Sequence, residues 1–183
     1  MAIANTGTPI GSYAPDFELP GTDGSVHHLA RYLDKFRIVC VVFMCNHCPY
    51  VRAYLNRLKQ IQADFYGQGI TLIGINANDA NQYPDDSFEN MRVFADDHQL
   101  NFPYLRDVTQ DVALSFGAEK TPQVFLVDQS GVLRYSGLVD DNSQNPQAVQ
   151  SPYLRDAIGQ LLNRKAITPT STPPMGCSVK WRQ

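Results

Sequence analysis

The feature that most constrains the fold is an apolar segment, residues 36–43 (FRIVCVVF), followed almost at once by a long helical pattern. Its β-branched, almost wholly apolar side chains are typical of a strand that is covered on both faces of a sheet. Apolar residues then recur at spacings of three and four from Tyr50 to Phe65, which predicts an amphipathic helix. Gly67 and Gly69 predict the end of this helix. The chain is therefore expected to run from the interior of a sheet directly into a helix.

The rest of the chain alternates between strand and helix patterns. Residues 17–19 and 25–27 flank a turn-rich segment and predict a β-hairpin, and residues 70–75 predict a second buried strand. The other expected elements are a helix over 29–33, a helix over 87–98, a strand over 102–105, a helix ending at Gly117, a strand pair over 124–127 and 132–135, and a helix within 147–165. Because the alternation ends in an antiparallel pair, we expect an α/β fold with a central mixed sheet flanked by helices.

The length of the chain suits one domain with a tail. Of its 183 residues, 43% are hydrophobic and 18% are charged, as in ordinary globular proteins. We expect residues 1–167 to form the domain. Residues 168–183 contain three prolines and no periodic pattern, so we expect them to form a tail that packs on the domain.

Charge and targeting signals limit the partners and the location. The net charge of −3 gives no electrostatic reason to bind nucleic acid or an anionic membrane. The segment 1–11 has neither the basic residues nor the apolar stretch of a targeting signal, and no apolar run is long enough to span a bilayer. We therefore expect a cytoplasmic protein; the sequence does not fix its oligomeric state.

Cys45 and Cys48 form a Cys-x-x-Cys motif at the predicted strand-to-helix junction. The first turn of a helix has unpaired N–H groups and the positive end of the helix dipole, which together stabilise a thiolate. Two intervening residues allow the second sulfur to reach the first. We expect Cys45, at an exposed tip, to attack a substrate disulfide, and Cys48 to resolve the mixed disulfide.

Four further segments carry a resemblance to a known family. Residues 14–17 (APDF) resemble the opening motif of the redoxin branch of thioredoxin-fold proteins, the AhpC/TSA type. Residues 43–50 (FMCNHCPY) resemble the active site of a peroxiredoxin-like subgroup that carries a thioredoxin-type cysteine pair. Thr121-Pro122 is similar to the family's cis-proline loop, and residues 176–181 (GCSVKW) resemble the subgroup's terminal motif. The resemblance covers nearly the whole chain.

This resemblance implies a thioredoxin-like fold with an N-terminal β-hairpin extension and an irregular C-terminal tail. It implies a thiol–disulfide oxidoreductase that exchanges disulfides with protein substrates through Cys45 and Cys48, without a cofactor. Pro122 would be cis and would face the disulfide, and the backbone of Thr121 would offer strand-like hydrogen bonds to a substrate peptide. The partners would be protein disulfides and a thiol electron donor of the thioredoxin or glutathione type.

The residues around the pair depart from thioredoxin in two ways. Met44 stands where thioredoxin has a tryptophan, and we assign Met44 and Asn46 to substrate binding. The buried aspartate that accepts a proton in thioredoxin corresponds to Val39, so the proton acceptor is not identified. His47 is expected to stabilise the thiolate by charge or by a hydrogen bond, which makes the disulfide more oxidising. We therefore predict that the reduction potential of the pair is less negative than the value for thioredoxin, which is about −270 mV.

A thiol peroxidase is the first alternative, because peroxiredoxins belong to the same branch. Cys48-Pro49 occupies the Cys-Pro position of their motif, which would make Cys48 the peroxidatic thiol. However, Cys45 stands where that motif has a hydroxyl residue, and Pro122 aligns with its peroxide-polarising arginine. Without these two groups little stabilises the charge that develops on the leaving oxygen, so disulfide exchange is the preferred function.

A metal-binding protein is the second alternative. A Cys-x-x-Cys motif supplies half of a structural zinc site, and the chain has no second such motif. If Cys177 folds over Cys45 and Cys48, the three sulfurs would suit Cu(I) or Zn. We assign no metal ligand. Cys177 is either a third redox thiol or an unreactive tail cysteine, and Cys40 is expected in the core.

Two polar segments near residue 80 are interpreted as loop or helix-end features. Asp86, in the pair Asp85-Asp86, is expected to cap the helix that starts at Ser87. Residues 78–81 (NDAN) do not continue into a calcium-binding pattern. We expect them to form a solvated loop near the site.

Overall fold

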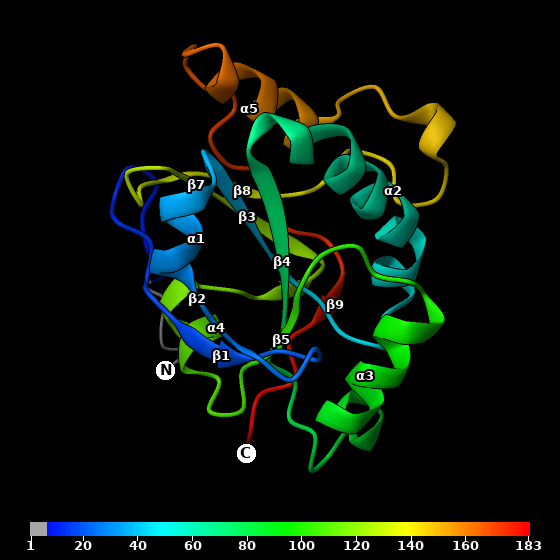
Figure 1. Ribbon diagram of the computed structural model, residues 1–183. Coiled ribbons are helices and arrows are strands. Elements are labelled where there is room, and N and C mark those ends of the chain that lie inside the picture. Colours follow the sequence, from blue (N-terminus) through cyan, green and yellow to red (C-terminus); the bar gives the residue numbers. More distant parts are fainter. Residues whose placement is uncertain (1–6) are drawn as a thin grey trace, which may run out of the picture.

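A five-stranded mixed sheet forms the centre of the protein in the computed structural model, which describes residues 7–183 (Figure 1). The strands lie in the order β5-β4-β3-β7-β8. They are β3 (Ile38–Phe43), β4 (Ile70–Asn76), β5 (Tyr104–Arg106), β7 (Gln123–Asp128) and β8 (Leu133–Gly137). Strand β3 pairs parallel with β4 and antiparallel with β7, which confirms the predicted mixed sheet.

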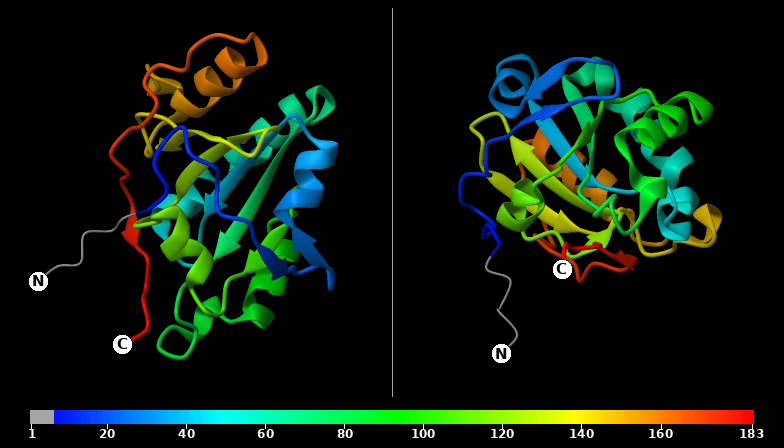
Figure 2. Two further views of the ribbon diagram at one scale, coloured as in Figure 1. Left: turned by 90° about the vertical axis from the view of Figure 1, so that its left-hand side faces the viewer. Right: turned by 90° about the horizontal axis from the view of Figure 1, so that it is seen from below.

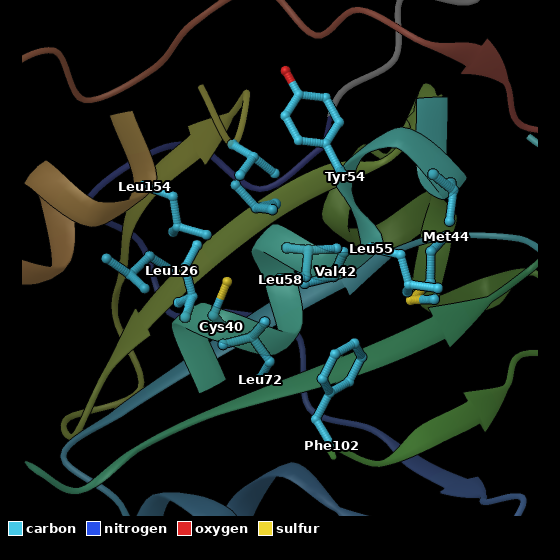
Figure 3. Close-up of a cluster of buried hydrophobic side chains, with 14 of the residues drawn as sticks. Cys40, Val42, Met44, Tyr54, Leu55, Leu58, Leu72, Phe102, Leu126 and Leu154 are labelled. Carbon is cyan, nitrogen blue, oxygen red and sulfur yellow. The ribbon is translucent and has the colours of Figure 1, made fainter. Parts of the chain in front are cut away.

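Strand β3 lies at the middle of the sheet, and all of its residues are buried. Val39 and Val41 contribute to a core cluster on one face, and Cys40 and Val42 contribute to a second cluster on the other. Figure 3 shows Cys40 and Val42 among the buried side chains of this second cluster. Because both faces are covered, the strand has apolar side chains in both directions, as the sequence predicted.

Helices cover both faces of the sheet (Figures 1 and 2). The cluster that contains Cys40 includes buried residues of α2 (Pro49–Phe65), α3 (Phe88–Asp97) and α5 (Tyr153–Leu162). The cluster that contains Val41 includes residues of α1 (Leu29–Lys35) and α4 (Asp111–Phe116). An antiparallel hairpin of β1 (Glu18–Pro20) and β2 (Val26–His28) precedes α1, close to its predicted position.

The last helix lies within the segment where it is predicted. Within residues 147–165, α5 runs from Tyr153 to Leu162, and Pro146–Ala148 form one short 3₁₀ turn. Pro152 stands immediately before α5, and a proline disfavours helical backbone in the residue before it. Two other 3₁₀ turns, Tyr66–Gln68 and Pro84–Asp86, precede β4 and α3.

The C-terminal segment packs along one side of the sheet, as the left view of Figure 2 shows. Ser136 of β8 donates a backbone hydrogen bond to Thr170 and accepts one from Thr172. Farther on, β9 (Cys177–Ser178) pairs antiparallel with the short strand β6 (Lys120–Thr121). The boundary of the domain at residue 167 stays a prediction, and residues 1–6 of that domain lie outside the described residues. Over residues 7–183, no helix combines the length and apolarity needed to cross a membrane.

Candidate redox site

The two cysteines of the motif lie between the end of β3 and the start of α2. Pro49 is the first helical residue, a position that suits proline because its missing N–H needs no partner there. Cys48 is therefore the N-cap residue of this 17-residue helix, and Cys45 precedes it by three residues. The helix N-terminus thus acts on the second cysteine. The motif alone predicts that it acts on the first, Cys45.

Both cysteines are buried. Their exposed fractions are 4% for Cys45 and 3% for Cys48, so the expectation that Cys45 forms an exposed tip is wrong. Both side chains belong to the core cluster that contains Cys40, and the half-buried Cys177 packs against the same cluster. The tail therefore contributes to covering the pair.

A hydrogen bond between the two cysteine side chains separates their acidities. The bond to Cys48, together with burial, raises the pKa of Cys45 far above its usual range. The same bond lowers the pKa of Cys48 to about 4, against the opposing effect of burial. A second hydrogen bond from Cys177 and one from the backbone of Val51 act in the same direction. Cys48, at the N-cap of α2, is therefore the more acidic thiol of the pair.

Thr121 contacts all three sulfur-bearing residues of the site. The predicted cis peptide bond between Thr121 and Pro122 is present. The hydroxyl of Thr121 lies 3.5 Å from the Sγ of Cys45 and donates at 3.5 Å to the carbonyl of Cys177. Its carbonyl oxygen lies 3.2 Å from the Sγ of Cys48 and accepts a hydrogen bond when that thiol is protonated. The loop therefore faces the cysteine pair, as the resemblance implied.

The backbone edge at Thr121 is occupied by the tail of the same chain. In the β6–β9 ladder Thr121 lies opposite Cys177, and Lys120 lies opposite Ser178. The ladder is extended by the N–H of Val179, which donates to the carbonyl of Glu119 at 3.0 Å. The resemblance assigns this edge to a substrate peptide. In this structure β9 holds that place.

Met44 lies in the core and does not line a binding surface. It is 1% exposed, and Figure 3 shows its side chain among the buried apolar residues. A Cβ added at Gly74 would approach its sulfur to 2.8 Å, so the glycine of β4 makes room for this side chain. The expected role of Met44 in substrate binding is therefore replaced by a packing role.

Asn46 is also buried, and its polar groups form hydrogen bonds within the protein. Its side-chain amide donates to the carbonyl of Asp85 at 2.8 Å, and its side-chain oxygen accepts from the hydroxyl of Tyr104 at 2.8 Å. The carbonyl of Asn46 accepts from the Nε of Arg52 at 3.2 Å. These bonds fix the shape of the cysteine loop and leave the side chain no free group for a substrate.

Asp86 lies beneath the cysteine loop and was not recognised from the sequence as a site residue. Its expected role as a helix cap is wrong, because Ser87 is the N-cap of α3. The buried carboxylate of Asp86 accepts a hydrogen bond of 2.8 Å from the backbone N–H of Asn46. It also accepts hydrogen bonds of 3.0 Å from the side-chain amides of Asn76 and Asn78. The sequence signal was the mostly polar segment 78–86 (NDANQYPDD) that follows the buried strand β4.

The same polar network holds the tail. Asn78 accepts a hydrogen bond of 2.9 Å from the backbone N–H of Lys180. The carbonyl of Lys180 accepts from the backbone N–H of Asp79 at 2.8 Å and from the amide of Gln110 at 2.9 Å. The segment 78–81 does lie near the site, but Asn78 and Asp79 are buried and do not form the expected solvated loop.

His47 is directed away from the sulfurs. Its side chain is 56% exposed, and its Nε2 lies 3.6 Å from a carboxylate oxygen of Asp85. Within residues 7–183, no hydrogen bond joins His47 to a cysteine, so that part of its expected tuning role is not found. An effect of its charge on the pair stays a prediction.

The structure does not assemble a metal site from the cysteines. Over the described residues, 7–183, no group of three or more His, Cys, Asp or Glu side chains is arranged to hold a metal ion. Cys40 is fully buried in β3, and burial raises the pKa of its thiol well above the usual range. It is a core residue, as predicted.

Three comparisons place this site among known proteins. Residues 10–136 match the AhpC/TSA family. The thiol-disulfide oxidoreductase ResA of Geobacillus thermodenitrificans (strain NG80-2) is 28% identical over 135 residues, which are 70% of this chain and 69% of ResA. The crystal structure of a hypothetical protein from Sinorhizobium meliloti 1021 has 34% identity and a TM-score of 0.88 over 97% of each chain.

A more distant structure identifies the fold alone. A thioredoxin family protein from Chlorobium tepidum TLS, described as a thiol:disulfide interchange protein, shares 20% identity and a TM-score of 0.59. The match covers 75% of this chain and 91% of that protein. The central mixed sheet with helices on both faces is thus a thioredoxin-like fold.

Proposed function

The chain belongs to the AhpC/TSA family, and from this premise we propose that it is a thiol–disulfide oxidoreductase that exchanges disulfides with protein substrates through Cys45 and Cys48. One observation carries the proposal. The two cysteines lie at the strand-to-helix junction, with Cys48 as the N-cap of α2, and the sulfurs of both contact Thr121 of the cis-proline loop. The similarity to ResA supports the same activity.

In this mechanism Cys48 makes the first attack. Its pKa of about 4 makes it a thiolate at neutral pH, and the thiolate is the nucleophile in disulfide exchange. It attacks one sulfur of the substrate disulfide, so that a mixed disulfide forms and a substrate thiolate departs. This order reverses the roles expected from the sequence, because the helix N-terminus and the thiol donors act on Cys48.

Cys45 then resolves the mixed disulfide. Its sulfur attacks the Sγ of Cys48, the bond between Cys48 and the substrate breaks, and the proton of Cys45 passes to the departing substrate thiolate. Two electrons have moved from the protein to the substrate. A thiol donor of the thioredoxin or glutathione type, in the cytoplasm, returns the Cys45–Cys48 disulfide to two thiols. This donor class and this location are part of the proposal.

An insulin-reduction assay with dithiothreitol as the donor tests the proposal. The wild-type protein should accelerate insulin precipitation, and Cys48→Ser should abolish the acceleration. Cys45→Ser/Cys177→Ser, which removes both thiols beside Cys48, should accumulate a mixed disulfide with insulin, detectable on a non-reducing gel. Cys40→Ala, which removes a thiol outside the site, serves as the control and should keep the activity. A wild-type rate no greater than that of dithiothreitol alone, or an active Cys48→Ser variant, would exclude the proposal.

A thiol peroxidase is the second candidate, and the acidity of Cys48 at a helix N-cap favours it. The opposing observation is that Pro122 stands where the family's peroxide-polarising arginine aligns. Among residues 7–183, no arginine side chain donates a hydrogen bond to a cysteine. Stopped-flow mixing of the reduced protein with hydrogen peroxide distinguishes the two functions. We expect a rate similar to that of a free thiolate, whereas a much faster rate that depends on Cys48 would make the protein a peroxidase.

A further inference from the structure

Cys48 has a second thiol partner besides Cys45. The side chain of Cys177 packs against the core cluster that includes Cys48, and both cysteines contact Thr121. Their interaction lowers the pKa of Cys48 and raises that of Cys177. Cys177 approaches from the tail, more than a hundred residues away in the sequence, and lies opposite Thr121 in the β6–β9 ladder. Two thiols that belong to different parts of the chain, Cys45 and Cys177, therefore act on the acidity of Cys48.

The contacts of the tail place Cys177 at this position. A Cβ at residue 176 would overlap the carbonyl oxygen of Thr121, so only glycine allows the tail to approach this closely. On the other side of Cys177, Val179 is buried in the core cluster that contains Val41. The backbone of Lys180 is bonded to the loop that follows β4. Cys177 is thus fixed on both sides, and its thiol does not reach Cys48 by chance.

We propose that Cys48 forms a disulfide with Cys177 as well as with Cys45, and that strand β9 acts as an internal substrate that positions Cys177 for this exchange. The proposal deepens the proposed function and rests on it, because Cys48 must be the thiolate that attacks the substrate. Cys177 would then be a second resolving residue of the site, and the pairing of β9 with Thr121 would hold it in place.

The substrate disulfide is the only oxidant that this exchange needs. When Cys48 carries a mixed disulfide with a substrate, the sulfur of Cys177 attacks the Sγ of Cys48. The Cys48–Cys177 bond forms, the bond to the substrate breaks, and the proton of Cys177 passes to the departing substrate thiolate. Cys45 then attacks Cys48, which forms the Cys45–Cys48 disulfide and releases Cys177 as a thiol. The substrate has gained two electrons, and the protein has lost two.

The resting state of Cys177 agrees with this role. Burial and the hydrogen bond to Cys48 raise the pKa of Cys177 to about 11, so it stays protonated in the reduced protein. It can therefore donate to the Cys48 thiolate until Cys48 has reacted. Once the Cys48–Cys177 disulfide has formed, β9 is covalently held on the edge of Thr121, and a substrate peptide cannot pair there.

Disulfide mapping of the full chain tests the inference. Cys45→Ser retains three cysteines, since the chain has four. Oxidation with one equivalent of diamide should join the tryptic peptides 38–52 and 166–180 and leave one free thiol. The double variant Cys45→Ser/Cys48→Ser retains Cys40 and Cys177 and should give no such link. If Cys45→Ser gives no link, or if the double variant gives the same one, the inference is wrong.

Substitution of Gly176 tests the role of the strand. In the Cys45→Ser background, Gly176→Val should slow the link at least about tenfold, because it removes the effective concentration that β9 provides. Met175→Ala changes a neighbouring exposed side chain and should leave the rate unchanged. With Cys45 present, Gly176→Val should still form the Cys45–Cys48 disulfide, which shows that the variant is folded. An equal rate of linking in Gly176→Val would exclude the role of β9.

These results separate the inference from the proposed function. If wild-type protein reduces insulin and the Cys45→Ser variant never links Cys48 to Cys177, the inference alone fails. If the link forms in Cys45→Ser and wild-type protein does not reduce insulin, the proposed function fails.

Discussion

The backbone N–H of Asn46 donates a 2.8 Å hydrogen bond to the buried carboxylate of Asp86, a residue 40 positions farther along the chain. This bond ties the loop between the two cysteines to the segment that precedes α3. The same carboxylate accepts from Asn76 and Asn78, so three donors depend on one buried acid. The cysteine loop is therefore held by a polar network and not by apolar packing alone.

Asp86→Asn should destabilise the protein strongly. The backbone N–H of Asn46 and the amides of Asn76 and Asn78 now donate to the carboxylate of Asp86, and the new amide would point its own N–H groups at these donors. The free energy of unfolding should therefore fall by about 2–3 kcal/mol. Urea denaturation of the reduced protein measures the change. Asp85→Asn is the matched control, because the side chain of Asp85 is 73% exposed and its loss should have little effect. Equal stabilities of the two variants would show that the network around Asp86 is unimportant.

The acidity of Cys48 should be visible in the pH dependence of its alkylation by iodoacetamide. The thiolate is the reactive form, so the rate constant should be flat at neutral pH and fall as the pH decreases through about 4. Cys45→Ala removes the main hydrogen-bond donor and should move this fall toward the ordinary value of about 8.5. Mass spectrometry identifies the alkylated cysteine. If wild-type Cys48 already titrates near the ordinary value, the assignment of the thiolate is wrong.

The Cys45–Cys48 disulfide should be more oxidising than that of thioredoxin. A lowered pKa of Cys48 stabilises its thiolate and therefore favours the reduced form of the pair. We expect a potential less negative than about −270 mV, measured by equilibration with glutathione. A value at or below that of thioredoxin would contradict this prediction. His47→Ala, which alters an exposed side chain, tests whether the histidine charge contributes; a shift to a more negative potential would support its predicted role.

Met44→Ala separates packing from substrate binding. Because Met44 is 1% exposed, the truncation should leave a cavity and lower the free energy of unfolding by about 2–5 kcal/mol. The KM for insulin should not change, since the side chain does not reach the surface. Met44→Leu nearly conserves the volume and should keep most of the stability. A raised KM in both variants would restore the role in substrate binding.

The elements that could be predicted from the sequence are those whose signal is local. The apolar run of β3 reflects a strand that is packed on both faces. The spacing of apolar residues from Tyr50 to Phe65 reflects a helix that is packed on one face. The start of α5 at Tyr153 could also be predicted, because Pro152 is a helix boundary signal. The order of acidity in the pair was also accessible, since Pro49 at the first helical position makes Cys48 the N-cap.

The remaining features of the site depend on contacts between distant segments. The burial of Cys45 depends partly on a core to which helices from both halves of the chain contribute. Asp86 could be placed only by knowing that β4 ends beside β3, the strand that leads into the cysteine loop. No pattern within either segment contains this information. The pairing of Thr121 with Cys177 joins residues 56 positions apart. Such relationships arise from the topology of the sheet and not from local sequence.

The C-terminal tail also contains a natural fluorophore. Trp181, four residues after Cys177, is the only tryptophan of the chain, and it is half-buried against the core cluster that contains Val41. Its indole therefore exchanges an apolar environment for water whenever the last residues leave the sheet. The intrinsic fluorescence of the unlabelled protein would therefore report, while the thiols react, whether that segment leaves its place.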